Sequence, residues 1–392
     1  MSDYRIRNGQ LAVEMQPDPG VEEAPDAAAD AIKVRTSMGY SPNFDSIDTD
    51  YLQASLTQSA PITGGGNVGF TLPCFLKGSG TAGTAPDFGK LIRACGLSET
   101  LTAAAVSDTA QAGAASTITL HAGASAVDEA YKGMLISTTG GTGPGQTRVI
   151  AGYVGSTKVA TVYPAWTVTP DETTTFSVHA NAAYRPVSVG LERVSIATWQ
   201  HSSVGGNASR RRRLMDGMGT FRLGIPPRGL ATIDFTMTGN LPAAPDDVSK
   251  PSAPTYQSSE PGPFLAAQAY LGGAKVKFAE FSFDLAGDVQ QFDDPEAAYG
   301  YGPADILNRV STGSITPNLT LNSARDAFSD WLGSTSRALW LNWGPAAGKR
   351  VSLYFPALRY TGNTPGETRG FATEQIPFRS VAEDGEVWMC IY

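Results

Sequence analysis

The stretch ASRRRRLMDGMGTFRLGI, from Ala208 to Ile225, places four consecutive arginines directly before a glycine-punctuated segment with the residue types of a strand. In isolation Arg210 to Arg213 favour nucleic-acid binding, because clustered guanidinium groups neutralise phosphates and release counterions. The serine- and glycine-containing SSVGGNAS precedes them and LMDGMGTFRLGI follows, so the position also suits a charged hairpin loop between two strands. The rest of the chain favours the loop.

The composition is that of a folded, acidic, strand-rich protein. Its 392 residues include 29 basic and 37 acidic ones, a formal net charge of −8, which argues against a protein that wraps DNA tightly. Hydrophobic residues make up 41% of the chain, enough for two or three domains with cores of their own. With 43 glycines, 26 prolines and only 17% charged residues, the mixture favours strands joined by tight turns. We therefore expect a mostly β fold.

The three cysteines, Cys74, Cys95 and Cys390, lie far apart and without CxxC spacing. They indicate buried free thiols and neither a disulfide framework nor a zinc site. The N-terminal MSDYRIRNGQ lacks the apolar core of a signal peptide, and no window approaches the run of roughly 20 apolar residues that spans a membrane. We expect no membrane insertion and a product that stays in the cytoplasm until it is assembled or released.

The first hundred residues predict an arm, a strand and a helix. PDPGVEEAPDAAAD at 17–30 is polar and acidic and reads as an extended arm that contacts a neighbour. NVGFTLPCFLKGSG predicts a strand from Asn67. APDFGKLIRACG then predicts a short amphipathic helix with Asp87 as N-cap and Gly96 as terminator. Its one-sided apolar face consists of Phe88, Leu91, Ile92 and Cys95.

Residues 107–179 differ in residue pattern from the sequence around them. Short β-branched runs recur at a spacing of about ten residues and are divided by glycine turns. We interpret this segment as a small all-β module inserted at an exposed turn, because the helix before it and the strands after it belong together only if it is looped out. The runs are STITLHAG, KGMLISTT, QTRVIAGYV, STKVATVYPAW and TTFSVHA.

The second half repeats the order strand, helix, strands. AKVKFAEFSFDLAGDV (274–289) and LNRVSTGSITPNLTL (307–321) flank a loop, and ARDAFSDWLG predicts a helix whose apolar side contains Ala327, Phe328, Trp331 and Leu332. PRGLATIDFTMTGNLP (227–242) and AGKRVSLYFPALRYTGNTP (347–365) share an alternating strand that ends in Thr-Gly-Asn. These matches indicate a duplicated domain. Without 107–179 the chain divides into two units of about 160 residues, an ordinary domain size.

Catalytic and metal-binding patterns are missing. His121, His179 and His201 lack HExxH or HxH spacing, which favours structural or solvent-facing roles. GGTGPGQT at 140–147 approaches a phosphate-binding loop, but Gln146 occupies the lysine position and a strand follows in place of a helix. We expect no catalytic residue, no cofactor and no metal.

An acidic cluster in QQFDDPEAAYGYG admits two interpretations. Asp293, Asp294 and Glu296 could form an acid/base pair or a cation site. DDPE is also turn chemistry, and nothing else with metal-ligand character converges on it, so we favour a solvated hairpin loop. Its carboxylates could pair with Arg210 to Arg213 of a neighbouring subunit.

A family resemblance rests on several segments taken together: NVGFTLPCFLKGSGTAGTAPDFGKLIRACGLSET, YRPVSVGLERVSIATW, the arginine-bearing stretch, DGMGTFRLGIPPRGLATIDFTMTGN and the second strand-helix set. This pattern resembles the major tail tube proteins of long, non-contractile-tailed bacteriophages and covers most of the chain outside 107–179. The segment AGASAVDEAYKGMLISTTGGTGPGQTRVIAGYVGSTKVATVYPAW separately resembles a small β-domain that recurs in phage virion proteins.

The resemblance implies two tandem β-sandwich-like domains, each with one flanking helix, whose inner strands join into a multi-subunit β-barrel. Stacked rings would enclose a channel for the tape measure protein and for genome DNA. Related single-domain proteins form hexameric rings, so a duplicated domain implies a homotrimer with pseudo-sixfold symmetry, with a homohexamer as the alternative. The implied parts are an N-terminal arm with the first strands (1–60), domain 1 (61–106 plus 180–250), an outward-facing insert (107–179) and domain 2 (251–392).

The resemblance also assigns positions and partners. It implies a location in the virion tail after assembly in the host cytoplasm, contacts with tail tip and tail terminator proteins, and transient DNA passage. The expected barrel strands are 191–199, 218–225, 276–285 and 307–316. Phe88, Leu91, Ile92, Phe328, Trp331 and Leu332 would close the two sandwiches, and Arg210, Arg211, Arg212, Arg213, Asp293 and Asp294 would form contacts between rings or subunits.

Two other functions are also compatible with the sequence. A capsid decoration protein or minor tail protein would share the β-rich composition and the inserted module. A glycan hydrolase of the virion would need two acids about 5 to 9.5 Å apart across a cleft, and the sequence nominates no such pair.

Overall fold

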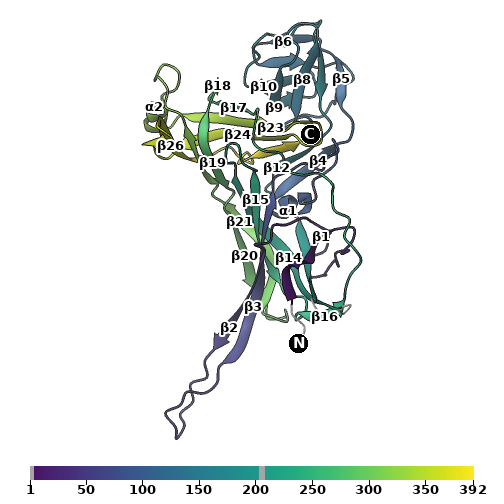
Figure 1. Ribbon diagram of the computed structural model, residues 1–392, viewed down its shortest axis with the longest axis vertical. Helices are drawn as coiled ribbons and strands as arrows, with labels where there is room; N and C mark the ends of the chain where they lie inside the picture. The colour runs from purple at the N-terminus through teal and green to yellow at the C-terminus, as the bar shows by residue number, and fades with distance from the viewer. Residues whose placement is uncertain (1–3, 203–207) are drawn as a thin grey trace.

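The computed structural model describes residues 4–202 and 208–392 and confirms the mostly β fold, with 51% of the residues in strands and 3% in helices. The strands pair antiparallel, and none of the sheets within these two ranges closes on itself. The molecule is elongated: a layered body carries a compact sheet at one end and a projecting hairpin at the other (Figure 1).

One continuous ladder of eight antiparallel strands runs through the body, and we call it the long sheet. Its inner face follows the strict alternation of apolar residues, as in Phe70 and Leu72 or Phe281 and Phe283, all buried. In order across the sheet, the strands are β2 (Gly39–Ile47), β3 (Ile62–Phe75), β15 (Thr232–Asn240), β14 (Ala208–Gly224), β19 (Phe278–Asp284), β22 (Thr312–Pro317), β26 (Phe371–Ser380) and β25 (Thr364–Thr368).

Further strands form a second layer behind the long sheet, and one contiguous apolar core fills the space between the layers. Two sets of strands make up this layer, and a separate hairpin, β20 (Gly287–Asp293) with β21 (Tyr301–Arg309), lies beside β14. The first set is β1 (Tyr4–Gln16), β13 (Arg193–Ser202), the N-terminal half of β14 and β16 (Asp246–Ser249). The second set is β4 (Leu97–Thr102), β12 (Asn181–Pro186), β27 (Trp388–Ile391), β24 (Val351–Tyr360), β23 (Ser336–Trp343), β17 (Gln268–Leu271) and β18 (Ala274–Lys275).

The strand β14 belongs to both layers because it bends at Asp216. Residues 209–214 pair with β13 and residues 218–224 pair with β15. One pair of each ladder, Gly217 with Val194 and Met215 with Asn240, overlaps at the bend, where both ladders shift register. Asp216 has a positive φ of 53°, a conformation that Asp tolerates better than most residues. Its fully buried carboxylate accepts hydrogen bonds of 2.7 Å from Gln16 Nε2 and Gly20 N, and one of 3.2 Å from Asn240 Nδ2. The bend is therefore fixed by a buried polar network.

The first helix, α1 (Gly89–Ala94), has the buried face that the sequence predicts: Phe88, Leu91, Ile92 and Cys95 are fully buried. The prediction that Asp87 is its N-cap is wrong, because Phe88 occupies that position without a side-chain cap. Asp87 lies 3.0 Å from Lys77 Nζ in an ion pair in which both side chains are buried. The carboxylate balances a buried cation in place of capping the helix.

The second helix, α2 (Ala327–Leu332), begins where the sequence predicts but presents the other side to the protein. Asp326 caps it by accepting from Ser329 N, and Ala327 and Asp330 are buried. Phe328, Trp331 and Leu332 are 53%, 36% and 69% exposed, so the prediction that they close a sandwich within the chain is wrong. Periodicity finds an apolar helix face but does not say which molecule covers it.

The predicted N-terminal arm is also different in the structure. β1 pairs with β13, and the segment that follows it packs on its own chain: Ile32 is buried and donates to Leu11 O, and Glu23 N donates to Ser195 Oγ. The prediction of an extended arm at 17–30 is therefore wrong. The projecting element is the loop 48–61 between β2 and β3, which extends furthest from the body (Figure 1).

The strands between residues 106 and 178 form their own seven-stranded sheet, which we call the insert. The insert docks on β23, β24 and β27 through aromatic side chains: Tyr163 Oη donates to Ala338 O at 2.8 Å and accepts from Gly273 N at 2.7 Å. These contacts fix its orientation on the body. Its strands are β5 (Val106–Thr109), β11 (Thr175–Val178), β8 (Leu135–Gly140), β9 (Thr147–Val154), β10 (Val159–Tyr163), β7 (Thr117–Thr119) and β6 (Ala112–Ala114).

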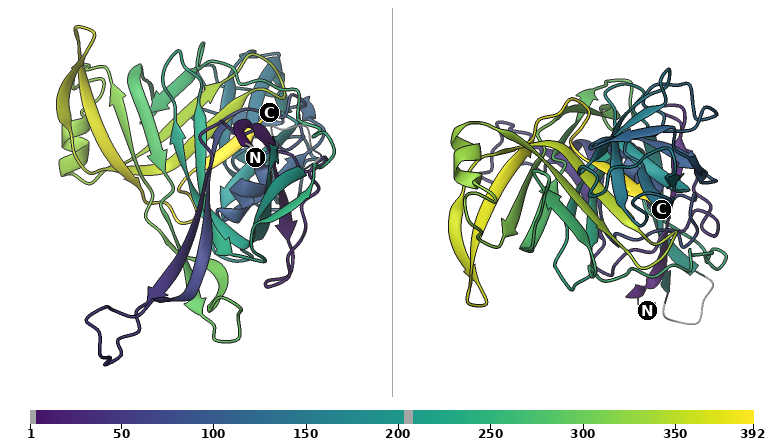
Figure 2. Two further views of the ribbon diagram at one scale, coloured as in Figure 1. Left: turned by 60° about the horizontal axis from the view of Figure 1, so that its bottom comes forward. Right: turned by 90° about the horizontal axis from the view of Figure 1, so that it is seen from above.

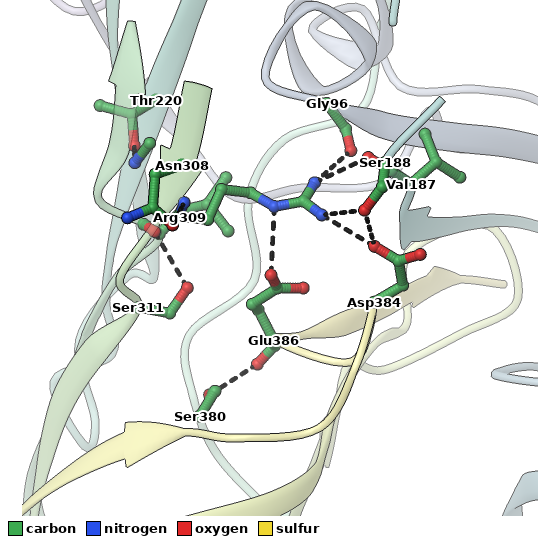
Figure 3. A network of polar contacts seen from close by, with 12 residues as sticks. Gly96, Val187, Ser188, Thr220, Asn308, Arg309, Ser311, Ser380, Asp384 and Glu386 are labelled. Carbon is green, nitrogen blue, oxygen red and sulfur yellow. Dashed lines mark hydrogen bonds and ion pairs between the residues drawn. The ribbon is translucent and has the colours of Figure 1, made fainter. Parts of the chain in front are cut away.

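A single arginine ties three distant parts of the chain together (Figure 3). From the end of β21, Arg309 donates to the carbonyl oxygens of Gly96 and Val187 at 3.0 and 2.9 Å. The same guanidinium pairs with Asp384 at 2.9 Å and with Glu386 at 3.1 Å. The Arg309 side chain is only 9% exposed, so these contacts replace its lost hydration.

We expect Arg309→Ala to lower the free energy of unfolding by about 3 kcal/mol or more, because it leaves the largely buried Glu386 carboxylate without its cation and the Val187 carbonyl without its donor. Urea unfolding followed by tryptophan fluorescence measures the loss. Arg222→Ala is the matched control, since that side chain is 77% exposed and its ion pair should contribute less than about 1 kcal/mol. Equal losses for the two variants would contradict the role of Arg309.

Two histidines should make stability fall on mild acidification. Burial, with Arg350 nearby, lowers the pKa of His179, whose Nε2 lies 2.7 Å from Ser137 Oγ. Burial likewise lowers the pKa of His201, with Lys250 as a second cause. The unfolded chain therefore binds more protons near the ordinary histidine pKa, and the free energy of unfolding decreases as the pH falls from 7.5 towards 5.5. His179→Asn and His201→Asn should each flatten this decrease in denaturation curves, whereas a slope unchanged in both would exclude the explanation.

Candidate functional site

The outer face of the long sheet is polar along its whole width. Because side chains alternate between faces, the same strands that bury Phe and Leu inward present hydroxyl, amide and charged groups outward. Thr71 and Thr236, for example, lie directly opposite each other on β3 and β15. The exposed outward residues are Ser41, Asn43, Thr71, Thr236, Arg222, Glu280, Ser282, Thr312, Gln375 and Arg379.

Charges of opposite sign alternate along one row of this face. Asp234, Arg222 and Asp284 are directly opposite one another on β15, β14 and β19. Arg222 Nε donates to Asp284 at 2.6 Å, and Arg35 donates to Asp234 at 2.9 Å. Cross-strand pairs of this kind stabilise the register and cancel the local charge. A phosphate that approaches the row meets cations that are already paired with carboxylates.

A shallow groove of about 420 Å³ follows this row at the junction of β14 and β19. The junction is short, with three residue pairs between Arg222 and Gly224 on one side and Ser282 and Asp284 on the other. The groove is therefore the place where the two halves of the long sheet meet. Its lining combines the charged and hydroxyl side chains of this row with Leu223 and Phe283 from the two strands, and its two acids, Asp234 and Asp284, lie on either side of Arg222.

The long sheet has an unpaired edge at each end. Among the described residues, β2 forms a ladder with β3 alone and β25 with β26 alone. Open edges of this kind expose backbone N–H and C=O groups that can pair with another strand. Each edge strand also contains a proline, Pro42 or Pro365, which removes one donor. The two edges are thus available for pairing but short and interrupted.

The four arginines of the opening stretch lie within β14, so the prediction of a hairpin loop is wrong at these positions. Arg210 and Arg211 pair with Asp247 and Asp246 across the ladder to β16. Arg213 pairs with Glu22 at 2.8 Å. Arg212 lies over the ring of Tyr40, with its guanidinium carbon 5.6 Å from the ring centroid. All four side chains therefore have partners within the chain, and a contact with another ring stays a prediction.

The acidic cluster lies at the turn of the β20–β21 hairpin. Asp293 ends β20, and Asp294 accepts from Glu296 N at 2.9 Å. The structure does not bring this cluster to the four arginines within one chain, because those pair with Asp246, Asp247 and Glu22. An ion pair between these carboxylates and the arginines of a neighbouring copy stays a prediction.

The predicted barrel strands fall in different places. The segments 218–225 and 276–285 lie in the long sheet as β14 and β19. The segment 191–199 belongs to β13 in the second layer, and 307–316 divides between the end of β21 and β22. The place of 191–199 follows from the bend in β14, and the division of 307–316 follows from the turn at residues 310–311. A barrel role for these segments stays a prediction.

The remaining candidate residues have structural surroundings. Cys74, Cys95 and Cys390 are buried free thiols, as the sequence predicts, and burial raises the pKa of each. His201 lies in β13, and its Nδ1 is 2.8 Å from Ser209 Oγ. In ranges 4–202 and 208–392 no three His, Cys, Asp or Glu side chains cluster as metal ligands. No helix in these ranges has the length and apolar character to cross a membrane.

The chain matches no protein-family model and no curated protein. The residues that sequence reasoning missed are those of the charged row: Arg35, Asp234 and Asp284. Their signal is present in the sequence as the polar positions of period-two strands, where Asp234 alternates with Ile233 and Phe235 and Asp284 with Phe283 and Leu285. Register across strands, which sequence alone does not give, is what assembles them.

The paired row predicts a specific effect of charge on DNA binding. Asp234→Asn combined with Asp284→Asn frees Arg35 and Arg222, and we expect affinity for a short DNA duplex to rise by about tenfold at low salt, with a steeper salt dependence. Fluorescence anisotropy at several salt concentrations measures both quantities. Glu172→Gln with Glu383→Gln removes the same net charge from exposed positions elsewhere and should have a smaller effect. Equal gains from the two pairs would show that net charge alone matters.

Proposed function

We propose that this chain is the structural subunit of a phage tail tube, in which copies join through the edges of the long sheet and stack as rings around a channel. The observation that carries the proposal is the open eight-stranded sheet with a polar, charge-compensated face and two unpaired edges. In a single chain the backbone N–H and C=O groups of these edges have no strand to pair with, whereas in a ring each edge can pair with an edge of the next copy.

Joining β2 of one copy to β25 of the next would continue the ladder from chain to chain. A closed ring of these sheets forms a barrel, which removes both edges. We favour three chains per ring, each contributing the strands of two tandem domains, 61–106 with 180–250 and 251–392. The paired hairpins support this duplication: β14 turns into β15 with Gly224 opposite Thr232, and β23 turns into β24 with Trp343 opposite Val351, a loop of the same length.

The polar face would line the channel. Its hydroxyl groups stay hydrated, and its arginines Arg35 and Arg222 are held by carboxylates. DNA and a tape measure protein could then pass without finding unpaired cations, which would otherwise retain a polyanion through counterion release. The formal charge of −8 acts in the same direction.

The order of the layers supports an outward position for the insert. Leu339 and Leu341 of β23 point into the core behind the long sheet, and Trp340 between them packs against the insert. The insert therefore lies on the side of the second layer that faces away from the polar face. With that face towards the channel, the insert is exposed on the outer surface of the tube.

Negative-stain electron microscopy of the purified chain, combined with native mass spectrometry of the smallest stable ring, tests the proposal. We expect hollow tubes with a regular axial repeat and rings of three chains. Rings of six chains would support the tube function but contradict the proposed domain duplication. A chain that stays monomeric, alone and with a tail tip or tape measure protein, would overturn the proposal in favour of a capsid decoration or minor tail protein.

A further inference from the structure

Two exposed apolar surfaces have no partner in the described part of this chain. The first is the arm tip, formed by Tyr51, Leu52 and Leu56 in the loop 48–61, where both leucines are fully exposed. The second surrounds α2, and we call it the α2 patch: Leu319, Leu321, Phe328, Leu332 and Phe371. Large side chains gathered on the surface of a soluble protein indicate an interaction site.

The parts of the α2 patch lie close together, along the chain and through a main-chain contact. Leu319 N donates to Ala372 O at 2.9 Å, which places the segment before α2 beside Phe371 at the start of β26. Phe328 packs edge-on against Trp331, with ring centroids 5.8 Å apart. The Asp326 cap and the ion pair of Asp330 with Arg337 hold the helix that presents these side chains.

The arm tip and the α2 patch lie on the same side of the molecule but towards opposite ends of its long axis. Figure 1 shows α2 at the upper left and the arm reaching to the lower left, and the left panel of Figure 2 shows both again on one side. The arm of a chain cannot fold back onto its own α2 patch across the length of the body. A second copy displaced along the long axis brings its patch towards this arm tip.

We propose that the arm tip of one copy docks on the α2 patch of a second copy in the next ring. This inference rests on the proposed function and names the surfaces that join one ring to another. The contact is head-to-tail, so each added ring presents a new free arm tip or patch and growth continues along the axis. A contact of the same surface with itself would stop at two rings.

The size of the two surfaces favours docking between copies that are already assembled into rings. Three side chains on the arm tip and five on the patch bury at most a few hundred Å² per partner, well below the roughly 800 Å² per partner of a stable pair of proteins. A single docked arm is therefore too weak to hold two free chains together. Several arms in one ring engage at once and add their free energies, so stacking requires assembled rings.

Cysteine cross-linking tests the contact in assembled tubes. The native cysteines are buried, so a bismaleimide reacts mainly with introduced ones. We expect Leu52→Cys with Phe328→Cys to give an open-ended ladder of cross-linked chains on a denaturing gel. Leu52→Cys with Val127→Cys is the matched control, because Val127 is at least as accessible as Phe328 but lies in the insert, and it should give no ladder.

Each outcome separates this inference from the proposed function. Tubes without cross-links between residues 52 and 328 would overturn the docking and leave the tube intact. Cross-linked products that end at the number of chains in one ring would place the contact between neighbours within a ring, which also overturns it. Absence of tubes in the unmodified chain would reject the proposed function itself. Leu52→Asp with Leu56→Asp should leave folded rings, measured by circular dichroism and mass, but abolish tubes.

Discussion

The bend of β14 at Asp216 is the constraint on which the two-layered body depends. The same strand lies between β13 and β16 of the second layer before the bend and in a central position of the long sheet after it, so the layers cannot separate without unpairing it. The bend places a carboxylate in the interior, and its hydrogen bonds to Gln16, Gly20 and Asn240 bring the N-terminal strand and the end of β15 to the same point. Buried polar groups of this kind favour one arrangement, because any other leaves them unsatisfied.

Alternation along single strands produces the remaining layers. In β24 the neighbours Leu353, Tyr354 and Phe355 contribute in turn to the central core, to the insert contact and to the central core again. The same rule on the long sheet gives one apolar and one polar face. The long sheet thus has one buried face, whereas β23 and β24 of the second layer are buried on both faces, against the central core and against the insert. The helices among the described residues are no longer than six residues, so strands supply nearly all of this packing.

The sequence predicts the strand content and several local elements of the fold, and the predictions that are wrong share one cause. Turn residues and period-two runs predict the β class, the runs within 107–179 and the buried face of α1. Local pattern predicts a loop at the arginine stretch, because Asp246, Asp247 and Glu22, which neutralise it, are distant in sequence. It predicts an interior position for Phe328, Trp331 and Leu332, because a helical repeat reveals an apolar stripe but not its partner. Long-range pairing is the information that local patterns lack.

The prolines on the two edge strands bear on how such a chain survives at high concentration in a cell. β2 and β25 differ in length, and Pro42 and Pro365 interrupt their hydrogen-bonding capacity at different places. Two copies of the same edge therefore make a poor ladder, which disfavours amyloid-like growth of identical strands. In a crowded cell, an edge strand that pairs poorly with its own copy leaves its exposed backbone groups free for a strand of different sequence.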